Sequence, residues 1–128
     1  MKTEKEIHAL VVENDAAAAT SMKKILQDRQ YAVTLLSKKD EVSQLLKEKL
    51  FSLVIAGDTE DSDSPFHIMK EIVMVSPMTS VILITDVSKE EVDEKAEGYG
   101  IVGHVNRAVK SEDVIPLLES FEAIFGSF

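Results

Sequence analysis

Five short apolar runs recur along the chain, and segments with helical periodicity separate them. The runs cover residues 8–12, 32–36, 51–56, 80–85 and 100–105, and they are rich in valine, isoleucine and leucine. Most of them show no alternation of apolar and polar residues. This pattern is typical of strands that are covered on both faces, as in a parallel sheet.

The segments between the runs carry apolar residues three or four positions apart, which predicts amphipathic helices. We expect Asp15 to cap the first helix, Ser64 and Pro65 to begin the third, and Ser111 to begin the last. One stripe of the last helix is expected to face the core, and it consists of Val114, Leu117, Leu118, Phe121 and Phe125.

The second helix is expected to begin at a capping box, in which two polar side chains bind the first free N–H groups of a helix. Ser37 and Asp40 have the spacing of such a box. The inner face of this helix would then carry Val42, Leu45, Leu46 and Leu50.

The fourth helix has the smallest apolar face. Ser88 and Glu91 form its capping box, and Gly98 is expected to end it. Only Val92 and Ala96 follow on one side. This helix is therefore expected to be weakly anchored, with room to move or to be covered by a partner.

Strict alternation of five strands and five helices predicts a single α/β domain over residues 1–128, with three layers and right-handed crossovers. In such open sheets the functional crevice lies at the carboxyl ends of the strands. The residues expected there are Glu13, Asn14, Asp15, Gly57, Asp58, Thr85, Asp86, Asn106 and Arg107.

Composition and charge limit the partners of this domain. The chain has 128 residues, of which 45% are hydrophobic and 29% charged, and its net charge is −9. This charge repels phosphate backbones and anionic membranes, so proteins are the expected partners and nucleic acids and membranes are not. The absence of cysteine and the short apolar run near the N-terminus predict a cytoplasmic protein.

The ordered set of strand-end residues resembles a response-regulator receiver domain of two-component signalling, over residues 7 to 125. The resemblance implies a flavodoxin-like (βα)5 sandwich with a parallel five-stranded sheet in the order 2-1-3-4-5. It also implies phosphoryl transfer to an aspartate at the end of the third strand, with Mg²⁺ held by neighbouring carboxylates. Chains of this kind are signalling modules, and we do not expect an enzyme.

The resemblance places the phosphoacceptor at Gly57, which has no side chain to phosphorylate. The acidic pair after the first strand falls on Glu13 and Asn14, and the amide of Asn14 replaces the main metal-binding acid. No cofactor is therefore expected. Magnesium binding, if any, would be weak and would use Glu13 and Asp58, with Asp15 as a further candidate.

The remaining positions of the family pattern are partly kept. The switch hydroxyl falls on Thr85, the switch aromatic residue on His104, and the lysine and proline that follow on Arg107 and Ala108. Thr85 could serve only to satisfy backbone groups. Arg107 could form a structural ion pair with Glu13 or Asp58 across the crevice in place of catalysis.

Asp58 belongs to an acidic loop with two alternative interpretations. The loop carries Asp58, Glu60, Asp61 and Asp63, which favour a solvated polar loop over a weak cation site. A bulge at Gly57 would bring Asp58 into the acceptor position. That shift would make the chain an orthodox phosphoacceptor with Mg²⁺.

The pattern as a whole favours a degenerate, or pseudo-, receiver that acts by binding proteins, without an aspartyl phosphate. A phosphoacceptor using Asp58 and a small α/β enzyme or ligand binder remain alternatives. The expected partners are a histidine kinase, an output domain or a second copy of the chain. We expect a homodimer or a partner-bound state through the fourth helix, fifth strand and fifth helix, at Val92, Ala96, Ile124 and Phe128.

Overall fold

A parallel sheet of five strands forms the centre of the molecule. The computed structural model describes residues 6–62 and 64–125. The sheet has the order β2-β1-β3-β4-β5, which is the order predicted from the sequence. Its strands are β1 (His8–Val12), β2 (Ala32–Leu36), β3 (Leu53–Ala56), β4 (Ser80–Ile84) and β5 (Gly103–Val105).

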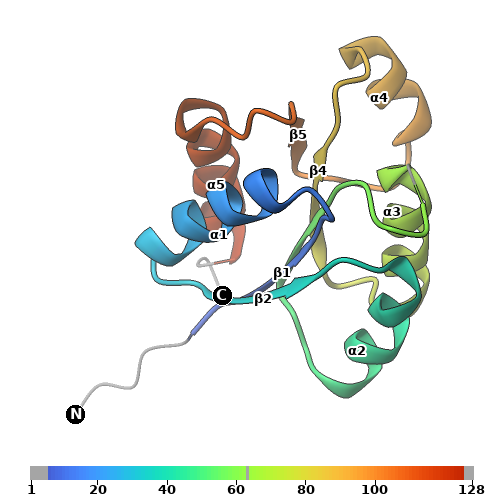
Figure 1. Cartoon of the computed structure of the whole chain (residues 1–128), viewed down its shortest axis with the longest axis horizontal. Helices are drawn as coiled ribbons and strands as arrows, with labels where there is room; N and C mark the ends of the chain where they lie inside the picture. Colours follow the sequence, from blue (N-terminus) through green and yellow to red (C-terminus); the bar gives the residue numbers. More distant parts are fainter. Residues whose placement is uncertain (1–5, 63, 126–128) are drawn as a thin grey trace.

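The helices lie in two layers, one on each face of the sheet (Figure 1). Helices α1 (Ala16–Asp28) and α5 (Ser111–Phe125) cover one face. The other face is covered by α2 (Val42–Glu48), which follows the short 3₁₀ turn η1 (Lys39–Glu41), and by α3 (Pro65–Val75) and α4 (Lys89–Lys95). This is the flavodoxin-like three-layer arrangement that we expected.

Burial on both faces explains the uninterrupted apolar runs of the central strands. All four residues of β3 have no exposed surface, because alternate side chains enter the two cores. Leu53 and Ile55 pack under α1 and α5, whereas Val54 and Ala56 pack under α2, α3 and α4. Such strands cannot carry polar residues on either side, so the chain's polar chemistry is confined to their ends.

Several predicted helix ends are confirmed. The Asp15 carboxylate accepts hydrogen bonds from the N–H groups of Ala17 and Ala18 at the start of α1. The Ser88 hydroxyl accepts from the Glu91 N–H at the start of α4. The predicted end of α4 at Gly98 is wrong, because the helix ends at Lys95. Gly98 lies in the turn that follows, with a φ of 85°, a left-handed conformation that glycine adopts without strain.

The predicted capping box of α2 is wrong. The turn η1 comes first, and the N–H groups of Lys39 and Asp40 donate to the carboxylate of Asp61 from a different part of the chain. The Ser37 hydroxyl donates instead to Glu60. Leu50 also departs from the prediction, because α2 ends at Glu48 and Leu50 is 71% exposed beyond it.

Candidate functional site

The ends of β1 and β3 lie side by side at the carboxyl edge of the sheet. Val12 and Ala56 are paired in the sheet, and the pairing continues because the Gly57 N–H donates to the Val12 carbonyl at 2.8 Å. The Asn14 N–H donates to the Asp58 carbonyl at 2.9 Å. Glu13 and Gly57 therefore meet as neighbours at the entrance of the crevice.

The side chain of Glu13 occupies the space in which a residue at position 57 would place its own. Its side chain has no exposed surface. A Cβ atom added to Gly57 would lie 2.0 Å from Glu13 Oε1 and 2.9 Å from Glu13 Cδ, far inside van der Waals contact. The crevice thus contains a carboxylate from the residue after β1 in place of one from the residue after β3, and Glu13 would have to shift before a side chain could fit at position 57.

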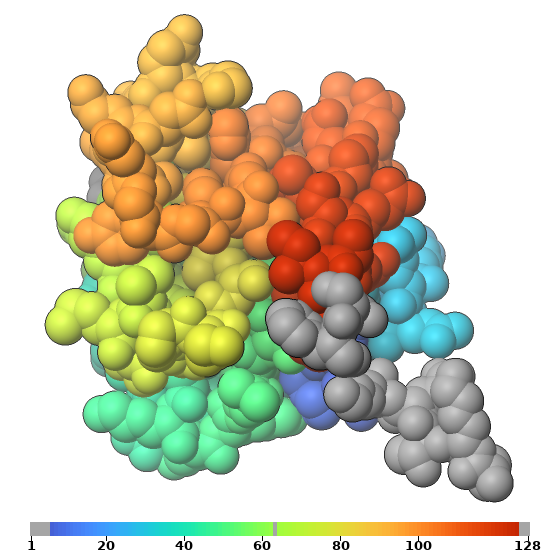
Figure 2. Space-filling view, turned by 180° about the vertical axis from the view of Figure 1, so that it is seen from behind, coloured from blue at the N-terminus to red at the C-terminus, as the bar shows by residue number. Residues whose placement is uncertain are grey.

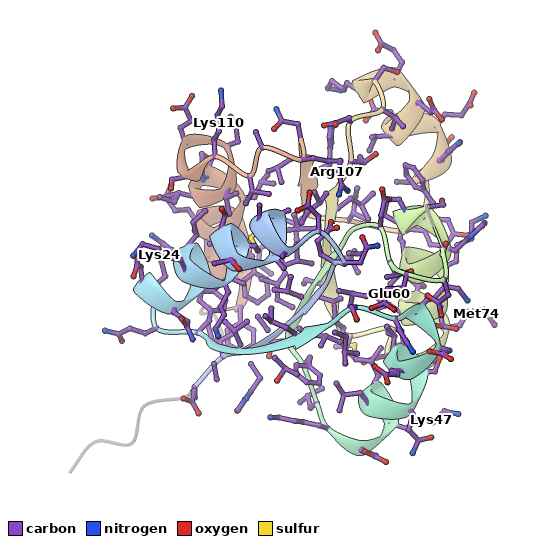
Figure 3. All side chains as sticks on the ribbon, in the orientation of Figure 1. Lys24, Lys47, Glu60, Met74, Arg107 and Lys110 are labelled. Atoms are coloured by element: carbon purple, nitrogen blue, oxygen red, sulfur yellow. The ribbon has the colours of Figure 1, made fainter. Side chains whose placement is uncertain are left out.

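Arg107, labelled in Figure 3, contacts this carboxylate and two further acids. Its Nη2 atom is 3.2 Å from Glu13 Oε2 and 3.5 Å from Asp15 Oδ2. Its Nη1 atom is 3.4 Å from Glu13 Oε1 and 3.2 Å from Asp58 Oδ2. The ion pair expected between Arg107 and Glu13 or Asp58 is therefore present, and it includes both acids.

The electrostatics of this cluster favour the charged form of Arg107. Partial burial by itself would lower the pKa of the guanidinium, but the charges of Glu13, Asp58 and Asp15 and the hydrogen bond to Glu13 outweigh it and raise the pKa. The Asp15 N–H also donates to Glu13 Oε2 at 2.9 Å. The buried Glu13 carboxylate is thus compensated by the protein itself.

No group of three or more acids, histidines or cysteines is placed to hold a metal ion within residues 6–62 and 64–125. Glu13 and Asp58, the two carboxylates considered for magnesium, both contact the Arg107 guanidinium. Asn14 is exposed, with its backbone bound to Asp58. A guanidinium therefore stands among the carboxylates that a cation would need.

The carboxylates of the acidic loop after β3 do not converge on one point. Asp58 turns to Arg107, whereas Glu60 binds the Ser37 hydroxyl and lies toward α2 (Figure 3). Asp61 accepts from the first N–H groups of η1, chiefly that of Lys39, and this lowers the pKa of its carboxyl. Asp63 lies outside the described residues. These acids support local structure, as expected for a polar loop.

Thr85 and His104 line a polar pocket of about 420 Å³ on the far side of the crevice. Thr85 is 7% exposed, and its hydroxyl accepts the Val87 N–H at 3.3 Å, within its own turn. His104 is half-buried in β5. Thr85 therefore satisfies a backbone group, which is one of the two roles expected for it.

Asp86 lies in the candidate site, and the sequence reasoning named it at a strand end but gave it no role. Its carboxylate accepts the main-chain N–H of Arg107 at 2.9 Å, and it also lines the pocket beside Thr85 and His104. The signal was present in the sequence, because Asp86 follows β4 just as Arg107 follows the neighbouring strand β5.

The residues expected at an interface differ in exposure. Val92 and Ala96 are only 2% and 7% exposed, so their side chains face the core, and their contact with a partner stays a prediction. Because α4 has so small an apolar face, both side chains are used to hold it on the core. Ile124 is 68% exposed, and Phe128 lies outside the described residues.

Comparisons with known proteins agree with this architecture. The model of the response regulator receiver domain family matches residues 9–119. A comparison with the sequences of curated proteins gave no match. Across the described part of the chain, no helix has the length and apolar character that a membrane crossing requires.

Three similar solved structures are receiver or chemotaxis proteins. A CheY-like response regulator receiver domain protein from Methanospirillum hungatei is 17% identical, with a TM-score of 0.81, over 97% of this chain and 100% of that one. The receiver domain of an HD domain-containing protein from Pseudomonas fluorescens is 19% identical, with a TM-score of 0.82, over 99% and 94%. The chemotaxis protein CheY4 of Vibrio cholerae is 18% identical, with a TM-score of 0.79, over 91% and 99%. These structures share the fold with the present chain.

The family match extends from β1 into α5 and includes every strand end that forms the crevice. The strand order and the two helical layers are those expected for it. The chain belongs to the response regulator receiver domain family of two-component signalling.

Proposed function

We propose that this receiver domain is a pseudo-receiver, which signals by binding other proteins and does not form an aspartyl phosphate. The observation that carries the proposal is the Glu13 carboxylate in the side-chain space of Gly57. In this proposal the domain acts in the cytoplasm without catalysis of its own. Its partners are a histidine kinase, an output domain or another signalling protein.

Two physical arguments support this function. Gly57 offers no nucleophile at the end of β3, and an incoming phosphoryl group would meet the negative charge of Glu13 there. Arg107 already neutralises that carboxylate, so the crevice does not need a metal ion to be electrostatically stable. Both features favour a crevice that Glu13 and Arg107 fill permanently over one that is phosphorylated and dephosphorylated.

An orthodox phosphoacceptor at Asp58 is the second candidate, because the Asp58 side chain is 33% exposed at the crevice. Its contact with the Arg107 guanidinium weakens it as a nucleophile. The two candidates differ in a single measurable product, an acyl phosphate on Asp58.

Incubation with acetyl phosphate and Mg²⁺, followed by intact-mass spectrometry, tests the proposal. We expect no phosphoryl adduct on the wild-type chain, and none on the Asp58→Asn variant. An orthodox receiver domain labelled in parallel shows that the phosphodonor is active. An adduct on the wild type that disappears in Asp58→Asn would overturn the pseudo-receiver function.

Self-association through the end of α5 is part of the proposal. Ile124 lines an apolar groove of about 670 Å³ whose rim includes the exposed side chains of Leu50 and Met78. On the face seen in Figure 2, the end of α5 lies beside the segments that precede β3 and β4. None of the residues lining this groove is charged, so two acidic chains could meet there with little repulsion.

Light scattering on the wild type and on the Ile124→Glu, Phe128→Glu double variant tests the dimer. We expect the wild type to have the mass of a dimer and the variant that of a monomer. An exposed control, Glu119→Lys on the same helix, should leave the dimer intact. A monomer in all three samples would remove self-association and leave the pseudo-receiver proposal untouched.

A further inference from the structure

Arg107 contacts the ends of several strands at once. Its main-chain N–H donates to Asp86 in the segment between β4 and α4, whereas its guanidinium binds Glu13 and Asp15 after β1 and Asp58 after β3. One residue after β5 thus bonds to the segments that follow three other strands.

These contacts differ in strength. The contact with Glu13 is the strongest, because the Glu13 side chain is fully buried and, among the described residues, Arg107 is the cation paired with it. Asp15 and Asp58 are partly exposed, so water screens their pairs with Arg107. Glu13 therefore fixes the place of Arg107, and the main-chain N–H of Arg107 is then presented to Asp86.

Asp86 connects the crevice with the pocket on its far side. Its carboxylate binds Arg107 and also lines the pocket of about 420 Å³ that contains Thr85 and His104. The Thr85 N–H donates to the Val105 carbonyl, so β4 itself is held by β5, but Asp86 lies one residue beyond this bond. The contact of Asp86 with Arg107 therefore links the segment that leads into α4 to the residues that follow β5.

We propose that Arg107 is a positioning residue that fixes the segment between β4 and α4, and with it the wall of the pocket beside Thr85 and His104. The inference rests on the proposed function, since it takes this surface to be used for binding without a phosphodonor. The guanidinium shape is essential to it. Two nitrogens of one planar group reach Glu13, Asp15 and Asp58 together, whereas a lysine would have to meet the three carboxylates from one nitrogen.

Amide NMR spectra of the ¹⁵N-labelled full chain test this inference. In Arg107→Ala we expect the amide resonances of residues 86 to 95 to move, together with those near Glu13 and Asp58. In Arg107→Lys the resonances of the same residues should move, but by smaller chemical-shift differences. Lys110→Ala removes a neighbouring exposed positive charge that points away from the crevice (Figure 3), and it should leave residues 86 to 95 unchanged.

A second variant isolates the bond to Asp86. In Asp86→Ala the exchange of the Arg107 amide hydrogen should become roughly 2- to 10-fold faster, because one hydrogen bond is lost. The resonances of Glu13 and Asp58 should stay in place. If Arg107→Ala does not fold, the Glu13→Gln, Arg107→Gln pair replaces it, since it leaves no uncompensated buried charge.

The inference is overturned if changes in Arg107→Ala, or in the paired variant, stay confined to residues 13 to 15 and 58. An unchanged exchange rate at Arg107 in Asp86→Ala also overturns it. The wild-type sample is treated in parallel with acetyl phosphate and Mg²⁺. A phosphoryl adduct there would refute the proposed function, and the NMR result would still decide the role of Arg107.

Discussion

Two arginines of this chain bind glutamate carboxylates, but their surroundings differ. Arg29, at the end of α1, donates from Nε to Glu122 of α5 at 3.0 Å, and the Tyr31 hydroxyl donates to the same carboxylate at 2.7 Å. The side chains of Arg29 and Glu122 are each 29% exposed. Arg107 instead faces Glu13, whose side chain is fully buried.

The difference lies in the charge balance. Arg29 pairs with one acid, Glu122, and this ion pair of zero net charge links the end of α1 to α5. Arg107 has three carboxylates within 3.5 Å, so its cluster keeps a negative excess at the carboxyl edge of the sheet. An excess of like charge opposes folding, and this excess lies at the edge where open α/β sheets place their sites.

The largest expected effect is the difference in the free energy of unfolding between the variants that lack Arg107 and Arg29. We expect Arg107→Ala to lower the free energy of unfolding by about 3 kcal/mol, because the buried Glu13 carboxylate is left without a counter-charge. Arg29→Ala should cost about 1 kcal/mol, because Glu122 can be hydrated. Urea unfolding at neutral pH measures both.

The double variant Glu13→Gln, Arg107→Gln is the control for this prediction. It should recover most of the stability lost in Arg107→Ala, since no buried charge remains unpaired. Equal losses for the two arginine variants would mean that the burial of Glu13 does not distinguish the two clusters.

The next effect concerns the space that Glu13 takes from position 57. Gly57→Ala should destabilise the fold by about 1 to 3 kcal/mol, because its Cβ would lie 2.0 Å from Glu13 Oε1. In a Glu13→Ala background the same change should cost much less. A double-mutant cycle of urea unfolding curves measures this coupling, and additive losses would contradict it.

Gly103 provides a matched comparison for this prediction. A Cβ there would lie 2.7 Å from Leu117 Cδ2, the end of a flexible side chain. Gly103→Ala should be insensitive to Glu13→Ala, because the atoms that its Cβ would meet belong to Leu117 and not to Glu13. It separates the specific conflict with Glu13 from the general cost of adding a methyl group.

The sequence was sufficient for the fold and for part of the site. The three-layer α/β fold followed from five apolar runs that alternate with helical segments, because such runs need cover on both faces, and the resemblance to receiver domains supplied the strand order. The pairing of Arg107 with Glu13 and Asp58 followed from their places at strand ends, which the topology brings together. Both inferences depend on patterns that are local in the chain and on general rules of α/β connection.

The rest depended on side-chain direction and on contacts between distant segments. That Glu13 turns into the space of Gly57 follows from the path of its side chain, which no residue pattern gives. Asp61 caps η1 from about 20 residues further along the chain, and the capping box at Ser37 was a plausible local alternative that it displaced. The bond between Arg29 and Glu122 spans 93 residues and had no local signal.

The smallest expected effect is the dependence of stability on pH, and it concerns the ion pair between Arg29 and Glu122. The hydrogen bonds from Arg29 and Tyr31 hold the pKa of Glu122 below its usual value, although partial burial opposes them. A carboxyl whose pKa is lower in the folded state stabilises the fold above its unfolded pKa, and this contribution is lost as the pH falls. Acid below about pH 4.3 should therefore weaken the tie between α1 and α5.

Urea unfolding of the wild type and of Glu122→Gln at pH 7 and pH 3 measures this contribution. We expect the wild type to lose about 1 kcal/mol more than the variant between the two pH values, because the variant has no carboxyl to protonate at this position. Glu119→Gln, an exposed neighbour on α5, should lose as much as the wild type. If Glu122→Gln loses as much as the wild type, the acid dependence arises elsewhere and the Arg29 cluster is only a surface contact.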